Sequence, residues 1–177
     1  MTEQIKRVHP FEIAKLGVAP FRPAGSYIDQ GPKKIKINGV ELESGAPGQP
    51  MGSCDYCGRG ILICFRVKDS TGRSFVVGSK CIEKTTHKGH PVYTAVQKVK
   101  RARAKEQRDQ RDALKITQLK TWLEDPEVID LLKAQPHAQK WRADKGETEH
   151  DRVIWYLKNA GVKGKIEMYK KIKALIA

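Results

Sequence analysis

The sequence lacks any apolar run that approaches the ~20 residues needed to cross a bilayer. Its N-terminal stretch, MTEQIKRVHPFEIAK, also lacks the long apolar core of a signal peptide. Both absences predict a cytoplasmic protein without a membrane partner. Because thiols stay reduced in the cytosol, clustered cysteines in such a protein favour a metal site over disulfides.

Negative charge is also scarce. The chain has 20 Asp and Glu against 34 Lys and Arg, which gives a formal net charge of +14 over 177 residues. Such a basic chain usually has a polyanionic partner, most often nucleic acid, DNA or RNA. The alternatives are an acidic protein partner and a basic surface that only keeps the chain solvated.

Only four cysteines are present, and all lie in CDYCGRGILICFRVKDSTGRSFVVGSKC, residues 54–81. Cys54 and Cys57 belong to a Cys-x-x-Cys-Gly turn, a zinc knuckle that points two thiolates at one spot. Residues 61–78 predict a β-hairpin that turns at DSTGR, so Cys81 returns beside Cys57 in the first turn of a short helix. Knuckle, hairpin and helix start together predict a treble-clef-like Zn²⁺ site, which needs four ligands when it is structural.

The fourth ligand is less constrained by the spacing. Cys64 lies about four residues up the strand, roughly 13 Å from the knuckle end at ~3.3 Å per residue, and is expected to be a small buried residue. His87 comes just after the short helix and can fold back to the metal. We rank His87 first, Cys64 second and His90 third. A treble clef usually has its fourth ligand three residues after the third, where this chain has Lys84.

The hairpin lacks histidine, which nucleases of the histidine–metal finger type need there. Redox chemistry of a Cys-x-x-Cys pair normally needs a thioredoxin-like βαβ context, and hairpins flank this pair instead. A cysteine nucleophile needs a nearby base and an orienting group, and none is identifiable. We therefore predict a non-enzymatic protein without catalytic residues, with nuclease activity as a third hypothesis.

GSCDYCGRGI, DSTGRSF and VVGSKCIEKT, followed by a Lys/Arg-rich helix, resemble a small cysteine module of many uncharacterised phage and plasmid proteins. The resemblance covers about residues 50–112. It implies zinc, with Cys54, Cys57 and Cys81 as ligands, and a phage or other mobile-element origin. The host cytoplasm is then the expected location. It implies no settled activity.

Large apolar residues are missing from Lys100 to Asp112, inside a segment that otherwise predicts a long helix. Each cation there that reaches a phosphate releases counterions and makes binding salt-dependent, whereas the alternative is a solvated connector. No base-reading pattern is recognisable, so sequence specificity is expected to be weak at most. The predicted nucleic-acid-binding residues are Lys98, Lys100, Arg101, Arg103, Lys105, Arg108 and Arg111.

Two local signals complete the pattern. KKIKINGVELES predicts a hairpin around Asn38-Gly39, because both turn positions need positive φ. TEHD, residues 148–151, resembles a helix capping box.

The aromatic residues of the C-terminal part can suggest base stacking, but helical spacing with Leu and Ile favours core packing for most of them. They are Trp122, Trp141, Trp155, Tyr156 and Tyr169.

The predicted fold class is α+β. A β-rich zinc-binding module (1–90), a basic connector helix (91–112) and a small helical bundle (113–177) follow one another. The predicted function is zinc-stabilised, non-enzymatic nucleic-acid binding. The alternative is a small interaction protein that binds and inhibits or redirects a host protein, for example a nucleic-acid enzyme.

Overall fold

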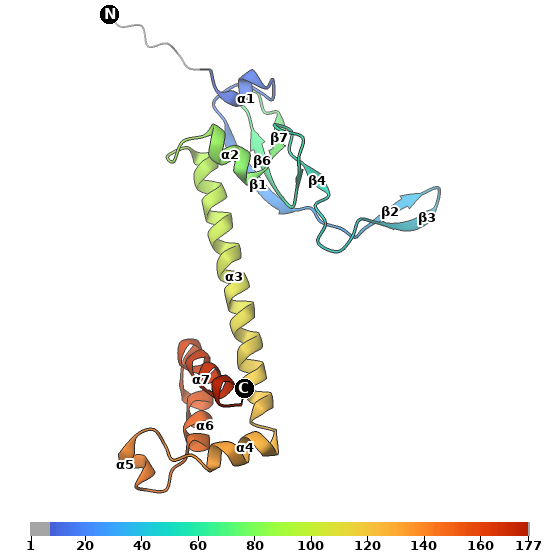
Figure 1. Cartoon of the computed structure of the whole chain (residues 1–177). Coiled ribbons are helices and arrows are strands. Elements are labelled where there is room, and N and C mark those ends of the chain that lie inside the picture. Colours follow the sequence, from blue (N-terminus) through green and yellow to red (C-terminus); the bar gives the residue numbers. More distant parts are fainter. Residues whose placement is uncertain (1–7, 177) are drawn as a thin grey trace, which may run out of the picture. The chain divides into compact units, whose positions relative to one another are not determined.

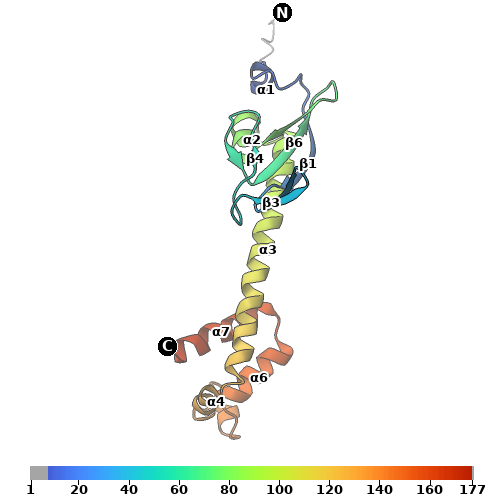
Figure 2. The same ribbon diagram turned by 90° about the vertical axis from the view of Figure 1, so that its right-hand side faces the viewer.

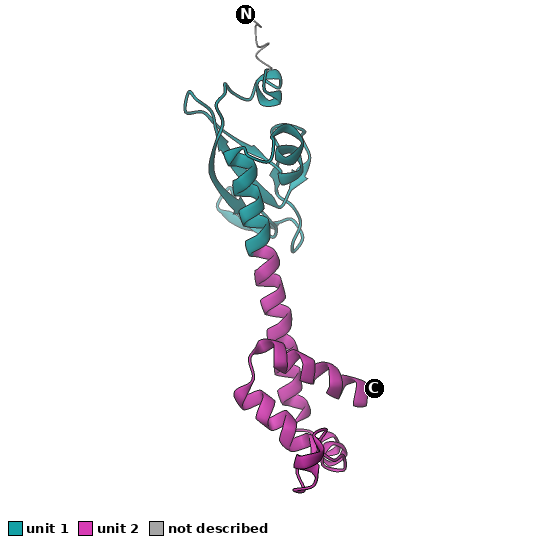
Figure 3. Cartoon of the chain, turned by 90° about the vertical axis from the view of Figure 1, so that its left-hand side faces the viewer, with its two compact units in different colours: residues 1–102 teal, residues 103–177 magenta. Residues whose placement is uncertain are grey.

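The computed structural model describes residues 8–176, and its coarse class is the predicted α+β: small antiparallel sheets and a long helix (Figure 1). The chain forms two compact units, which end and begin at Ala102 and Arg103 (Figure 3). This boundary falls inside α3 (Pro91–Trp122), within the predicted connector segment. Among the described helices, none combines the length and the apolar character that spanning a membrane requires.

Unit 1 is built around strand β6 (Ile63–Lys68), which pairs on both sides with antiparallel neighbours, β1 (Arg22–Ile28) and β7 (Ser74–Val77). Helix α2 (Ser79–Thr85) and strand β4 (Gly52–Ser53) also approach β6 (Figure 2). The hairpin predicted for residues 61–78 is confirmed, with the turn at DSTGR.

The core of unit 1 gathers side chains from distant parts of the sequence. The short helix α1 (Pro10–Ile13) contributes Phe11, whose ring meets Phe21, Tyr56 and Phe75 edge-on at 5.3–5.6 Å between centroids. Burial of these apolar groups is the main stabilising contribution to the unit. The other buried members of the cluster are Cys54, Phe65, Val67, Val77, Ile82, Val92 and Val96.

Strands β2 (Lys33–Ile37) and β3 (Val40–Ser44) form a separate two-stranded hairpin. Its turn residues Asn38 and Gly39 have φ values of 51° and 84°, as the sequence predicts. Figure 1 shows this hairpin extending away from the three-stranded sheet. One of its faces is apolar and exposed; it carries Ile35, Ile37, Val40 and Leu42.

Unit 2 packs the end of α3 with α4 (Pro126–Lys133), α6 (Glu149–Asn159) and α7 (Val162–Leu175); α5 (Lys140–Ala143) is a single turn. The predicted capping box at the start of α6 is confirmed: Thr148 and Asp151 exchange side-chain and backbone hydrogen bonds. The core consists of Leu119, Val128, Leu132, Val153, Met168, Tyr169 and Ile172.

Candidate functional site

The Cys-x-x-Cys turn lies between β4 and β5 (Gly60–Ile61). The Gly58 amide donates to the Cys54 carbonyl at 2.7 Å, and Gly58 has a φ of 71°, a conformation that favours glycine. The Cys54 amide donates to the Arg59 carbonyl at 2.9 Å and closes the base of the turn. These bonds make the turn compact and place both thiols on one side of it.

Asp55 anchors this turn to strand β7. Its amide donates to the Val76 carbonyl at 2.8 Å, and its Oδ2 accepts from the Val76 amide at 2.6 Å. The chain leaves β7 at Val77 and enters α2 at Ser79, so the anchor fixes the knuckle beside the start of that helix. Sequence reasoning missed this role, because an aspartate inside a turn has many local uses.

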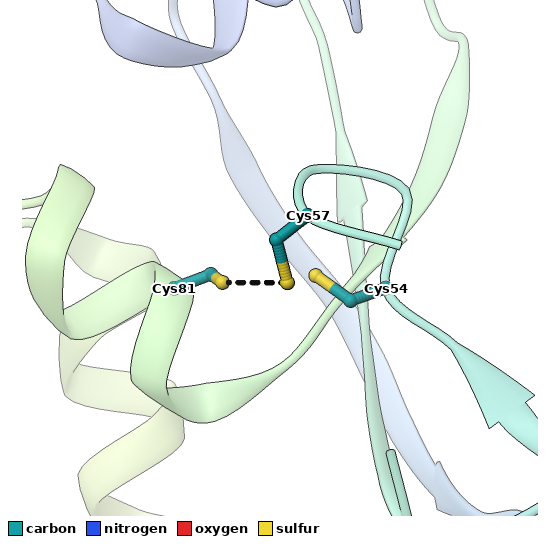
Figure 4. A group of neighbouring side chains, drawn as sticks. All are labelled: Cys54, Cys57 and Cys81. Carbon is teal, nitrogen blue, oxygen red and sulfur yellow. Dashed lines mark hydrogen bonds between the residues drawn. The ribbon is translucent and has the colours of Figure 1, made fainter. Parts of the chain in front are cut away.

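The thiols of Cys54, Cys57 and Cys81 converge (Figure 4). Their sulfur atoms all lie within 4.8 Å of one another, and the Cys57 and Cys81 sulfurs are 3.4 Å apart. Cys54 is buried, Cys57 is exposed and Cys81 is half-buried. The predicted convergence is therefore observed, and the three residues form a group that can hold a metal ion.

Backbone amides and burial act on these thiols in opposite directions. The Gly78 amide donates to the Cys54 sulfur at 3.3 Å. The Arg59 amide, followed by the Cys81 thiol, lowers the pKa of Cys57. Burial, followed by the neighbouring thiols, raises the pKa of Cys81 to about 12. A bound cation replaces protons in such a group, because metals bind the thiolate form.

The three candidates for a fourth ligand lie outside this group. Cys64 is fully buried opposite Tyr27 of β1, against Gly52, so the prediction that it is a small buried residue is confirmed. His87 follows the end of α2, and its ring lies 5.7 Å from that of His90. His90 in turn accepts a hydrogen bond from the Val92 amide at the start of α3. His87 as the fourth ligand stays a prediction.

No family model matches the chain, and no curated protein or solved structure is significantly similar to it. The resemblance to cysteine modules of phage and plasmid proteins therefore stays a prediction.

The seven predicted nucleic-acid-binding residues all lie on α3. Lys100 is engaged with α2: its Nζ lies 2.5 Å from Glu83 Oε1, which also accepts from Gln97 at 2.7 Å. The Lys100 hydrogen bond is the largest cause that lowers the pKa of Glu83. Among the described residues, no ion pair within 4 Å engages the other six cations.

Core packing of the aromatic residues is confirmed only in part. Trp122 stacks on Tyr169, with centroids 5.1 Å apart. Trp141 and Trp155 are instead 55% and 47% exposed, so core packing holds for fewer of the five than the four expected. The Arg142 guanidinium lies 4.9 Å from the centre of the Trp141 ring. Helical spacing alone does not predict the exposure of Trp141 and Trp155, because it does not show whether another element covers that face of the helix.

Proposed function

We propose that this chain is a non-enzymatic nucleic-acid-binding protein whose N-terminal unit is stabilised by a zinc ion. Cys54, Cys57 and Cys81 would hold the ion in a treble-clef-like arrangement. The three convergent sulfurs support zinc as the ion, because thiolate ligands suit Zn²⁺. Zn²⁺ also undergoes no redox change. The ion would tie the knuckle to the start of α2 and so fix the base of α3.

The observation that carries nucleic-acid binding is the basic segment 98–111 of α3. Six of its seven predicted cations have no ion-pair partner among the described residues, and five of those six are exposed. Cations without carboxylate partners remain available to phosphates, and each contact releases counterions. The net charge of +14 adds a long-range attraction for a polyanion.

The exposed tryptophans of unit 2 favour single strands among the possible nucleic acids. Trp141 lies beside two cations, because the Lys145 Nζ is 5.1 Å from its ring centre in addition to Arg142. Exposed aromatic rings next to cations suit base stacking and phosphate contact together. We therefore expect single-stranded DNA or RNA to quench tryptophan fluorescence more strongly than duplex DNA does.

The test is a set of binding titrations with single-stranded and duplex DNA and RNA, each across a salt series. We expect binding at low salt. As salt is added, log Kd should rise linearly with the logarithm of the salt concentration. A flat salt response, or no binding at low salt, contradicts the proposal. Plasmid DNA that is cut in the presence of Mg²⁺ or Mn²⁺ contradicts the non-enzymatic part.

The exposed apolar face of the β2–β3 hairpin favours the second candidate, a protein that binds a host protein. Its side chains are between 39% and 59% exposed, although β-branched residues on a strand usually pack against a neighbour. A pull-down from nuclease-treated bacterial lysate separates the two candidates. A stoichiometric partner that survives the nuclease and is lost in Ile37→Ser favours this candidate; loss of every partner with the nuclease favours nucleic acid.

A further inference from the structure

A cavity of about 570 Å³ adjoins the cysteine group, and all three clustered cysteines line it. Arg59, Lys80 and Lys84 also line this cavity, and among the described residues no acidic side chain does. Its remaining wall includes the apolar residues Ile61, Leu62 and Ile63. The thiols therefore face a space that is large enough for a small ligand and cationic on its polar side.

The positive charge of the side chains that line this cavity is larger than the negative charge that a metal-bound cysteine group would carry. Three thiolates around a divalent ion leave one surplus negative charge, whereas three cationic side chains surround the same space. Lys84 lies three residues after Cys81 on α2, and residues at that spacing share a helix face. The surplus of positive charge therefore lies on the side of the metal group that is open to the cavity.

Within residues 8–176 no histidine, carboxylate or further cysteine joins the three sulfurs as a fourth member of the group. Metal sites with three protein ligands keep a position for a water molecule or another exogenous ligand. Arginine and lysine are the side chains that recognise phosphate oxygens, arginine often with two parallel hydrogen bonds. The open position at the metal and the cationic lining of the cavity both favour a phosphate oxygen as the fourth ligand.

We propose that the fourth coordination position of the metal opens into this cavity and takes a phosphate oxygen, which Arg59, Lys80 and Lys84 hold. The inference rests on the proposed metal centre. The phosphate can come from a nucleic-acid backbone or from a free phosphate ion. On this proposal the fourth position belongs to phosphate and not to His87, which the sequence ranks first.

The test uses the full chain loaded with Co²⁺, whose thiolate charge-transfer band reports the cysteines and whose d–d bands report the fourth ligand. Inorganic phosphate is added at constant ionic strength, with chloride as the control. We expect a saturable change in the d–d bands with phosphate alone, while the thiolate band persists. A short single-stranded oligonucleotide is titrated in parallel. If it produces the same change, the backbone is the source; if only inorganic phosphate does, the source is the free ion.

Variants provide the decisive comparison. Lys80→Gln and Lys84→Gln, alone and combined, should retain the thiolate band and weaken the phosphate response, by about ten-fold for one lost charge-assisted hydrogen bond. His87→Ala should leave both bands and the response unchanged. Insensitivity of the d–d bands to phosphate, or their change in His87→Ala before phosphate is added, overturns the inference. An absent thiolate band overturns the metal centre with it, while the salt-series titrations judge nucleic-acid binding separately.

Discussion

At the scale of single residues, the four cysteines have two different roles. The sequence predicts that Cys54, Cys57 and Cys81 meet, because the β6–β7 hairpin returns the chain to its starting point, and the structure brings them together. It also predicts a buried Cys64, because strand geometry keeps that residue away from the knuckle. Strand geometry does not predict the fourth ligand, because the backbone of a loop such as the one that carries His87 has no regular repeat.

We expect Cys81→Ser to abolish metal binding and Cys64→Ser to retain it. Serine cannot supply the thiolate that the metal needs, whereas the Cys64 sulfur lies outside the group. Metal analysis of the purified variants should give about one zinc per chain for Cys64→Ser and close to none for Cys81→Ser. Loss of zinc from Cys64→Ser contradicts the assignment.

We expect Asp69 to make the stability of unit 1 depend on pH. Its carboxylate accepts hydrogen bonds from the amides of Val18, Thr71 and Arg73, and a side chain at Gly17 has no room beside it. Burial alone raises the pKa of Asp69, but the hydrogen bond from the Thr71 hydroxyl and those from the three amides together bring it below its usual value of 3.8. The ionised form is therefore the one that the fold stabilises.

Because the folded pKa is depressed, this contribution is complete above about pH 4 and is lost as the pH falls through the folded value. We expect Asp69→Asn to be less stable than the original chain at pH 7, and the difference to shrink below pH 4. Denaturant midpoints of both proteins between pH 2 and 7 measure it. A difference that stays constant across this range contradicts the assignment.

At the scale of elements, the anchor between the knuckle and β7 is a feature that only the structure reveals. Asp55→Ala removes the 2.6 Å bond to the Val76 amide and should weaken metal affinity about ten-fold, the lower end for residues that orient metal ligands. Asp55→Asn keeps an acceptor oxygen and serves as the matched control. Competition with a chromophoric chelator measures both; equal affinities of Asp55→Ala and the original chain would exclude the anchoring role.

Elements with strong local chemistry are predictable, and those defined by distant partners are not. Asn38-Gly39 determines the β2–β3 turn, and Thr148 with Asp151 determines the start of α6. Strand β1 is different, because Pro23 and Gly25 weaken its strand signal and its pairing with β6 forms across more than thirty residues. The exposure of Trp141 and Trp155 likewise depends on which neighbours cover a helix face.

At the scale of the whole molecule, the two units have separate apolar cores, and the described group of three cysteines belongs to unit 1. We expect a strong chelator to lower the thermal midpoint of unit 1 and to leave that of unit 2 unchanged. At free zinc a thousand times its Kd, the metal contributes about 4 kcal/mol to the folded state. Calorimetry with and without chelator should show one shifted transition; a single transition that ignores the chelator contradicts this expectation.

Phosphate contact by the α3 cations that lack an ion-pair partner among residues 8–176 is the central proposal. Its most direct test is the salt dependence of single-stranded DNA binding for the zinc-loaded chain and for the triple variant Arg101→Gln/Arg108→Gln/Arg111→Gln. Lys33→Gln/Lys34→Gln/Lys36→Gln, on the β2–β3 hairpin, removes the same charge elsewhere. We predict that the α3 variant lowers the slope of log Kd against log salt by about 2, at about 0.7 per lost contact, while the hairpin variant changes it little. Equal slopes for the original chain and the α3 variant would contradict the account.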